Sequence, residues 1–64
     1  MQYALLIYHL LYATRAELLR RLGRQAEAAD AYARARDLAT NEVERAYLER
    51  RRAEMHVAMH TGRT

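Results

Sequence analysis

One glycine, Gly23, stands between two segments with helical apolar spacing in the stretch from Leu5 to Asn41. Glycine readily adopts the left-handed backbone conformation that closes a helix, so Gly23 predicts the end of one helix just before the start of another. The chain has 64 residues, no proline and only two glycines. It also lacks the alternating apolar pattern of a strand. The predicted fold class is therefore all-α, with a helical hairpin at its centre.

Three helices are expected in a single domain over residues 1–64. The first is expected over about residues 2–22 and the second over about residues 25–39. Asn41 can cap a third helix while Glu44 reaches back toward it, so this helix is expected over about residues 41–60. One stripe of the third helix is expected to pack on the second: Val43, Ala46, Ala53 and Val57.

Bulky and small residues recur at fixed positions around Gly23: Tyr12, Ala16 and Leu19 precede it, and Ala28, Tyr32 and Ala35 follow it. These positions resemble those of a tetratricopeptide repeat. This unit of about 34 residues buries its apolar face against neighbouring units. The resemblance implies a tetratricopeptide-like hairpin with a third, capping helix, which binds partners. Two features depart from the pattern: the chain has no Trp, and Thr40 stands where a Pro usually closes the repeat. The residues expected to hold the fold are Tyr8, Tyr12, Ala16, Leu19, Ala28, Tyr32 and Ala35.

A longer run, from Leu10 to Glu54, is similar to the C-terminal tetratricopeptide-like extension of bacterial extracytoplasmic-function sigma factors. The similarity lies in YHLL at residues 8–11, RAELLRRLGR at 15–24 and YLERR at 47–51. It implies a regulatory or interaction segment in the bacterial cytoplasm, with transcription machinery as a partner. The promoter-binding and polymerase-binding domains of such factors are not among these residues, so the activity of a whole sigma factor is not implied.

The chain carries more apolar surface than its own hairpin can hide. One face of the first helix carries Thr14, Glu17 and Arg21 in its C-terminal half, but its N-terminal half is apolar. A stripe of the third helix is expected to point away from the second. A domain this small is near the limit for folding alone, and without cysteine it has no disulfide support. A homo-oligomer, most simply a homodimer, is therefore predicted, with its interface at Tyr3, Leu6, Ile7, Leu10, Leu48, Met55 and Met59.

Arginine side chains on the third helix leave a second function class open. The net charge is +3, and Arg45, Arg50, Arg51 and Arg52 could contact a partner or a phosphate backbone. Acidic residues are interleaved with them, which weakens the local field. The leading prediction is a self-associating protein-protein interaction module, and the alternative is a small basic nucleic-acid-binding protein.

Catalysis, metal binding and cofactor binding are not expected. The chain has neither Ser nor Cys to act as a nucleophile. His56 and His60 are spaced by four, but no Glu follows the first and no third ligand is near, so they are interpreted as a non-metal pair. His9 flanks the inward face of the first helix and is expected to be a hydrogen-bonded structural residue. Without a signal peptide or an 18-residue apolar run, a soluble cytoplasmic protein is expected.

Overall fold

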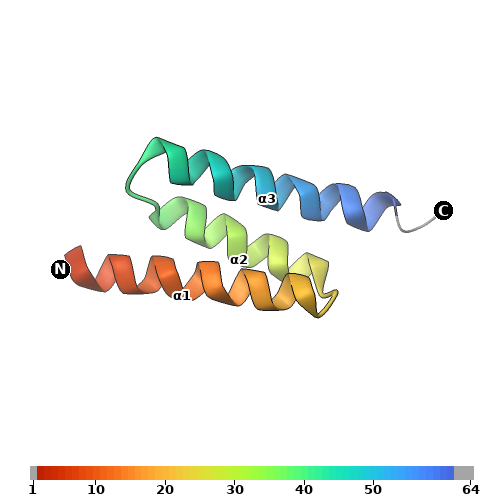
Figure 1. Ribbon diagram of the computed structural model, residues 1–64, viewed down its shortest axis with the longest axis horizontal. Helices are drawn as coiled ribbons and strands as arrows, with labels where there is room; N and C mark the ends of the chain where they lie inside the picture. The colour runs from red at the N-terminus through yellow and green to blue at the C-terminus, as the bar shows by residue number, and fades with distance from the viewer. Residues whose placement is uncertain (1, 62–64) are drawn as a thin grey trace.

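The computed structural model describes the backbone of residues 2–61 and the side chains of residues 4–58. It contains three α-helices: α1 (Gln2–Arg21), α2 (Gln25–Leu38) and α3 (Glu42–Thr61). Helix α2 lies between α1 and α3 and packs on both of them (Figure 1). The all-α prediction is confirmed, and each predicted helix boundary agrees to within one residue.

Gly23 closes α1 as the sequence predicts. Its φ angle is 79°, the left-handed conformation that costs residues with a Cβ atom free energy. The Arg24 N–H donates to the carbonyl of Leu19 at 2.9 Å, and the Gly23 N–H donates to that of Arg20 at 3.0 Å, which together form a Schellman motif. A Cβ atom added to Gly23 would meet nothing within 4 Å. The backbone conformation, and not a lack of space, is therefore what requires glycine here.

The start of α3 is capped by Asn41, but Glu44 has a different role from the predicted one. The Glu44 N–H donates to Oδ1 of Asn41 at 2.8 Å, which confirms the cap. The Glu44 carboxylate, expected to turn back toward Asn41, instead contacts Nε2 of His9 on α1 at 2.7 Å. One side of the predicted capping box is thus used to join two helices.

His9 links all three helices. Its side chain is buried, and its Nδ1 donates to the carbonyl oxygen of Ala35 at 3.0 Å. Ala35 lies in the last turn of α2, where carbonyl groups have no partner within the helix. Nε2 of the same ring reaches Glu44 in the first turn of α3. The prediction of a hydrogen-bonded structural histidine is confirmed.

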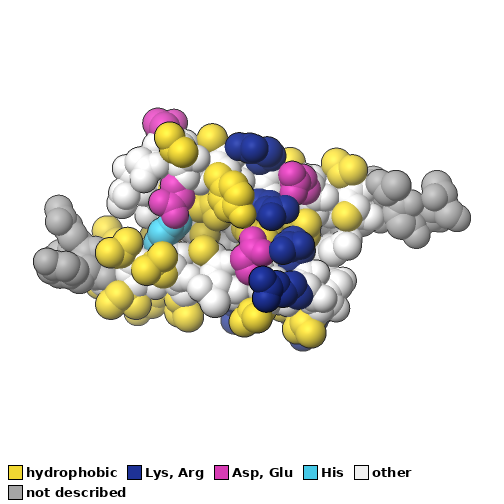
Figure 2. Space-filling model, viewed as in Figure 1, with side chains coloured by type: hydrophobic (Ala, Val, Ile, Leu, Met, Phe, Trp, Pro, Cys, Tyr) yellow, Lys and Arg dark blue, Asp and Glu magenta, His cyan; other side chains and the backbone are white. Residues whose placement is uncertain are grey.

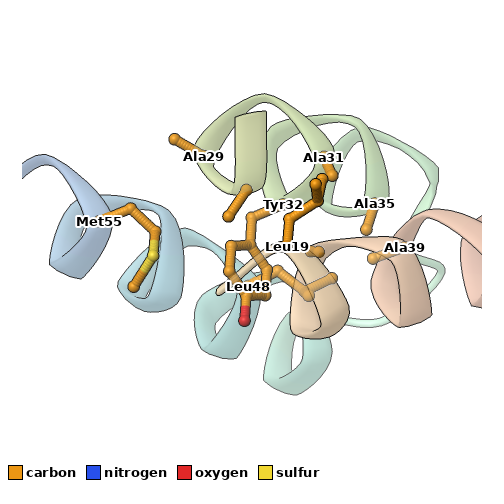
Figure 3. Packing of buried hydrophobic residues seen from close by; sticks show 10 residues of the cluster. Leu19, Ala29, Ala31, Tyr32, Ala35, Ala39, Leu48 and Met55 are labelled. Atoms are coloured by element: carbon orange, nitrogen blue, oxygen red, sulfur yellow. The ribbon is translucent and has the colours of Figure 1, made fainter. Parts of the chain in front are cut away.

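The core is small and rich in alanine. Among residues 4–58, six of the ten buried apolar residues are Ala, and Tyr32 is the largest side chain that is fully buried. Figure 3 shows Tyr32 projecting from α2 toward the helices that carry Leu19 and Leu48. Small side chains let helices approach closely, but each buries little apolar area. The packing therefore stabilises the fold less than a leucine-rich core of the same number of residues would.

Tyr8 was predicted to be a core residue, and this prediction is wrong. Its side chain is 53% exposed, whereas Ala16 and Ala28 are fully buried and Tyr12 is half-buried. Helix α1 has 20 residues and α2 has 14, so the N-terminal turns of α1 extend past the end of α2 (Figure 1). Tyr8 lies near the point where α2 stops covering α1, beside Leu38 in the last turn of α2.

The predicted faces of α3 are reversed. Leu48 and Met55, expected to point away from α2 and to cover a partner, are 2% and 6% exposed and belong to the core. Val43 and Val57, expected to pack on α2, are 83% and 64% exposed, and Ala46 and Ala53 are also exposed. Burying Leu and Met removes more apolar area from water than burying Val and Ala. The Met59 side chain lies outside the described residues.

Candidate interaction surface

Large apolar side chains remain exposed in both halves of α1. Figure 2 shows hydrophobic side chains along the outer edge of this helix. We use the name α1 surface for the eight such residues of α1 and the turn after it, each between 47% and 69% exposed: Leu5, Leu6, Ile7, Tyr8, Leu10, Leu11, Leu18 and Leu22. An exposed cluster of this kind is typical of a site that binds another macromolecule.

The predicted interface residues fall into two groups. Leu6, Ile7 and Leu10 are exposed, as an interface would require, whereas Leu48 and Met55 are buried within the chain and are not available to a partner. The side chain of Tyr3 lies outside the described residues. The interface itself remains a prediction.

The C-terminal half of the α1 surface was not predicted from the sequence. Thr14, Glu17 and Arg21 indicate a polar face in this half. Leu11, Leu18 and Leu22 lie beside these residues and are more than half exposed. The signal that was available is the spacing of seven and then four residues between the three leucines, since such spacings return to one side of a helix.

Shallow hollows follow the side of α1 that adjoins α2. The most apolar has a volume of about 470 Å³ and is lined by Tyr8, Leu11, Tyr12, Thr14, Arg15, Leu18 and Leu19. Two others, of about 430 and 320 Å³, extend onto α2 and share Tyr12 with the first. Arg34 lines both of these, and Asp30 and Asp37 line one each. The α1 surface is therefore indented and has charged residues at its α2 edge.

The predicted arginine cluster on α3 is largely compensated by intramolecular contacts. Arg45 pairs with Glu42 and also donates to the carbonyl oxygen of Ala39 at 3.0 Å. Arg52 pairs with Glu49. Paired guanidinium groups attract a phosphate backbone less than free ones do.

Arg51 is also engaged, since it pairs with Glu54 at 3.0 Å and lies over the ring of Tyr47 at 5.6 Å from its centre. Among the four arginines, only Arg50 makes no ion pair within the described residues. The arrangement gives the nucleic-acid alternative no support.

Charged side chains gather between α1 and α3, on the side shown in Figure 2. Glu17 accepts hydrogen bonds from Arg20 at 2.8 Å and from the Tyr32 hydroxyl at 2.7 Å, and these bonds lower its pKa. Burial, with the bond to Glu17, raises the pKa of Tyr32 to about 12. On α3, hydrogen bonds from Arg52 and Arg36 lower the pKa of Glu49 to about 2. These carboxylates thus join neighbouring helices.

Acid should therefore weaken the fold through Glu49. Its folded-state pKa lies below the ordinary value of 4.5, so its ion pairs stabilise the protein above about pH 4.5. That stability is lost as the pH falls toward about 2. We expect Glu49→Gln to reduce the fall in melting temperature between pH 5 and pH 2.5 by only a few degrees, because partly exposed pairs are screened by solvent (about 1 kcal/mol or less). Circular dichroism melts at one protein concentration measure this effect.

The control for this prediction is Glu54→Gln, since the ion pair of Glu54 with Arg51 lies within α3 and does not join two helices. It should change the acid dependence less than Glu49→Gln does. Equal acid sensitivity of the wild type and Glu49→Gln would contradict a stabilising role for the Glu49 pairs.

The described residues contain no group of three His, Asp or Glu side chains that could hold a metal ion. The side chain of His60 is not among them, so the interpretation of the His56/His60 pair stays a prediction. Among residues 2–61, no helix combines the length and the apolar content needed to span a membrane.

Comparison with family models, with curated proteins and with solved structures found no match to this chain.

Proposed function

We propose that this chain is a protein-protein interaction module that associates with itself through the α1 surface. The observation that supports the proposal best is the set of eight large apolar side chains that remain about half exposed or more after the three helices have packed. The proposed role is binding and not catalysis, and the proposed location is the cytoplasm.

The energetics favour an association of this kind. Burying one Leu or Ile side chain completely is worth about 1.5 to 3 kcal/mol. The free energy of unfolding of a small domain is only about 5 to 15 kcal/mol, and this core consists mostly of alanine. Even partial cover of the α1 surface would therefore add a large fraction of the stability of the isolated chain.

A second copy of the chain is the simplest partner because it brings the same surface. In a two-fold dimer, one patch on each protomer meets the same patch on the other, so a helix with exposed apolar residues in both of its halves is complementary to itself. The run from Leu10 to Glu54 is similar to sigma-factor extensions, and this similarity suggests where such a module would act. We propose a regulatory segment that binds transcription machinery in addition to a second copy of itself.

The experiment is sedimentation equilibrium on the wild type and on Ile7→Glu/Leu10→Glu. We expect a dimer for the wild type at micromolar concentrations and a monomer for the double variant, because burying two unpaired carboxylates in an apolar interface costs several kcal/mol. Circular dichroism should show that the variant keeps its helices, since both substituted side chains are exposed.

The matched control is Val43→Glu/Val57→Glu, which places the same charges on exposed apolar positions of α3. This variant should remain a dimer. A well-folded wild-type monomer would contradict self-association, and a dimer that persists in Ile7→Glu/Leu10→Glu would place the interface elsewhere.

A further inference from the structure

We propose that the partner on the α1 surface is the α1 helix of a second copy, packed antiparallel, with the two-fold axis passing between Thr14 and Arg15. This inference rests on the proposed self-association and adds the direction and the register of the two helices. Three features of α1 support it: the spacing of the residues around its hollow, the symmetry of its exposed apolar residues and the position of its charges.

The hollow on α1 has the form that receives a side chain from another helix. In knobs-into-holes packing, a knob inserts among four residues at positions i, i+3, i+4 and i+7 of the facing helix. The lining of the 470 Å³ hollow contains two such sets in succession. They are Tyr8, Leu11, Tyr12 and Arg15, and then Leu11, Thr14, Arg15 and Leu18. A helix with apolar knobs therefore fits this surface.

The exposed apolar residues of α1 can supply the knobs. Ile7, Leu11, Leu18 and Leu22 follow one another at spacings of four, seven and four residues, a pattern that reads the same in both directions. Its midpoint lies between Thr14 and Arg15. When two such helices pair antiparallel about this midpoint, Leu11 lies level with Leu18 of the second copy, and Ile7 lies level with Leu22.

The same register places knobs over holes. Leu18 of one copy comes to the level of the Tyr8, Leu11, Tyr12 and Arg15 hole of the other, because the middle of that hole lies close to Leu11. The same hole of the second copy receives Leu18 of the first in the same way, as two-fold symmetry requires. One offset therefore satisfies both the apolar pairing and the shape of the surface.

Charge favours the antiparallel direction over the parallel one. In a parallel pair, equal positions meet across the seam, which would bring Arg21 against Arg21 of the second copy. The antiparallel pair instead brings Arg21 level with Tyr8, and it also sets the helix dipoles in opposite directions.

The edge of the hollow offers further charges of both signs. Arg15, Asp30 and Arg34 line the adjoining hollow of about 430 Å³ and make no ion pair within the described residues. A second copy related by a two-fold axis presents the same charges, so unlike charges can face each other across the edge. The two Arg15 side chains near the axis have acidic neighbours in Asp30 and Glu27 of α2.

Disulfide cross-linking tests the direction directly, because the natural chain has no cysteine. Tyr8→Cys and Arg21→Cys are made separately at positions that are both exposed, so the fold should tolerate them. Each variant is oxidised alone and then as an equal mixture, and the products are separated on a non-reducing gel. Reduced samples are examined by sedimentation equilibrium in parallel.

In the antiparallel dimer the mixture should give the disulfide between Tyr8→Cys and Arg21→Cys as its main product, while neither variant alone should cross-link. Equal positions would then be about 20 Å apart along the helices, and a disulfide needs Cα atoms within about 7 Å. A parallel dimer gives the reverse result, with two homodimeric disulfides and no mixed product.

The outcomes separate the two proposals. Reduced variants that sediment as dimers but give the parallel pattern, or no cross-link at all, would overturn the antiparallel register and leave self-association standing. A folded wild-type monomer would overturn both, and so would a folded monomer of reduced Arg21→Cys, since Arg21 does not line the hollow.

Discussion

Replacing His9 with Ala should lower the free energy of unfolding by about 3 kcal/mol and the melting temperature by roughly 10 °C or more. The imidazole is buried and contacts acceptors from two other helices. Without it, the Ala35 carbonyl at the end of α2 loses its partner in a buried position, and a buried polar group left without a hydrogen bond costs about 1 to 3 kcal/mol. The cavity left by the ring adds to this cost. Urea denaturation at a fixed protein concentration measures the change.

Two further variants show which part of the loss is due to the hydrogen bonds. His9→Leu keeps most of the buried volume but cannot donate, so it should still lower the free energy of unfolding, by about 1 to 3 kcal/mol. Arg50→Ala truncates an exposed side chain that makes no ion pair within the described residues, and it should change stability by less than about 0.5 kcal/mol. If His9→Ala were as mild as Arg50→Ala, the link between the three helices would contribute no stability.

The helices and their ends could be predicted because local residues determine them. The left-handed conformation at Gly23 and the cap at Asn41 each involve a few neighbouring residues. The inward positions of Ala16, Ala28 and Tyr32 follow from helical spacing together with the resemblance to a known repeat. Helix ends and helical spacing depend on residues that are close in sequence, so they can be recognised in a short segment.

The rotation of α3 could not be predicted in this way. Its two apolar stripes have similar lengths, and the pattern alone does not show which one faces α2. The choice is coupled to polar contacts between distant residues, such as His9 with Glu44 and Arg36 with Glu49. Because Glu44 and Leu48 are four residues apart, a rotation that brings Glu44 to His9 also turns Leu48 inward.

The α1 surface was only half predicted for a related reason. Thr14, Glu17 and Arg21 indicated a solvated face, but a helix surface is wide enough to carry polar residues beside a separate apolar stripe. Only the packing of α2 shows that Leu11, Leu18 and Leu22 lie on the uncovered side. Leu6, Ile7 and Leu10 were easier to identify because the N-terminal half of α1 is apolar on every side. A two-helix hairpin cannot cover that much apolar surface.

Replacing Ala28 with Leu should lower the free energy of unfolding by about 1 to 3 kcal/mol, which corresponds to roughly 4 to 8 °C in melting temperature for each kcal/mol. Ala28 on α2 and Ala16 on α1 are both fully buried in the same core cluster. A close approach of the two helices at these positions is what the repeat pattern predicts. Three additional heavy atoms at Ala28 would force the helices apart or drive side chains out of their preferred rotamers.

The matched control for this packing prediction is Ala26→Leu, the same change at an exposed position of α2. Leu and Ala have similar helix propensities, so this variant should stay within about 0.5 kcal/mol of the wild type. Thermal melts followed by circular dichroism at one protein concentration compare the two variants. Equal melting temperatures would mean that the space around Ala28 can accept a larger side chain, and the tetratricopeptide-like register would then lose its main physical support. A fall confined to Ala28→Leu would instead show that the small side chain is required there because of the contact between the helices.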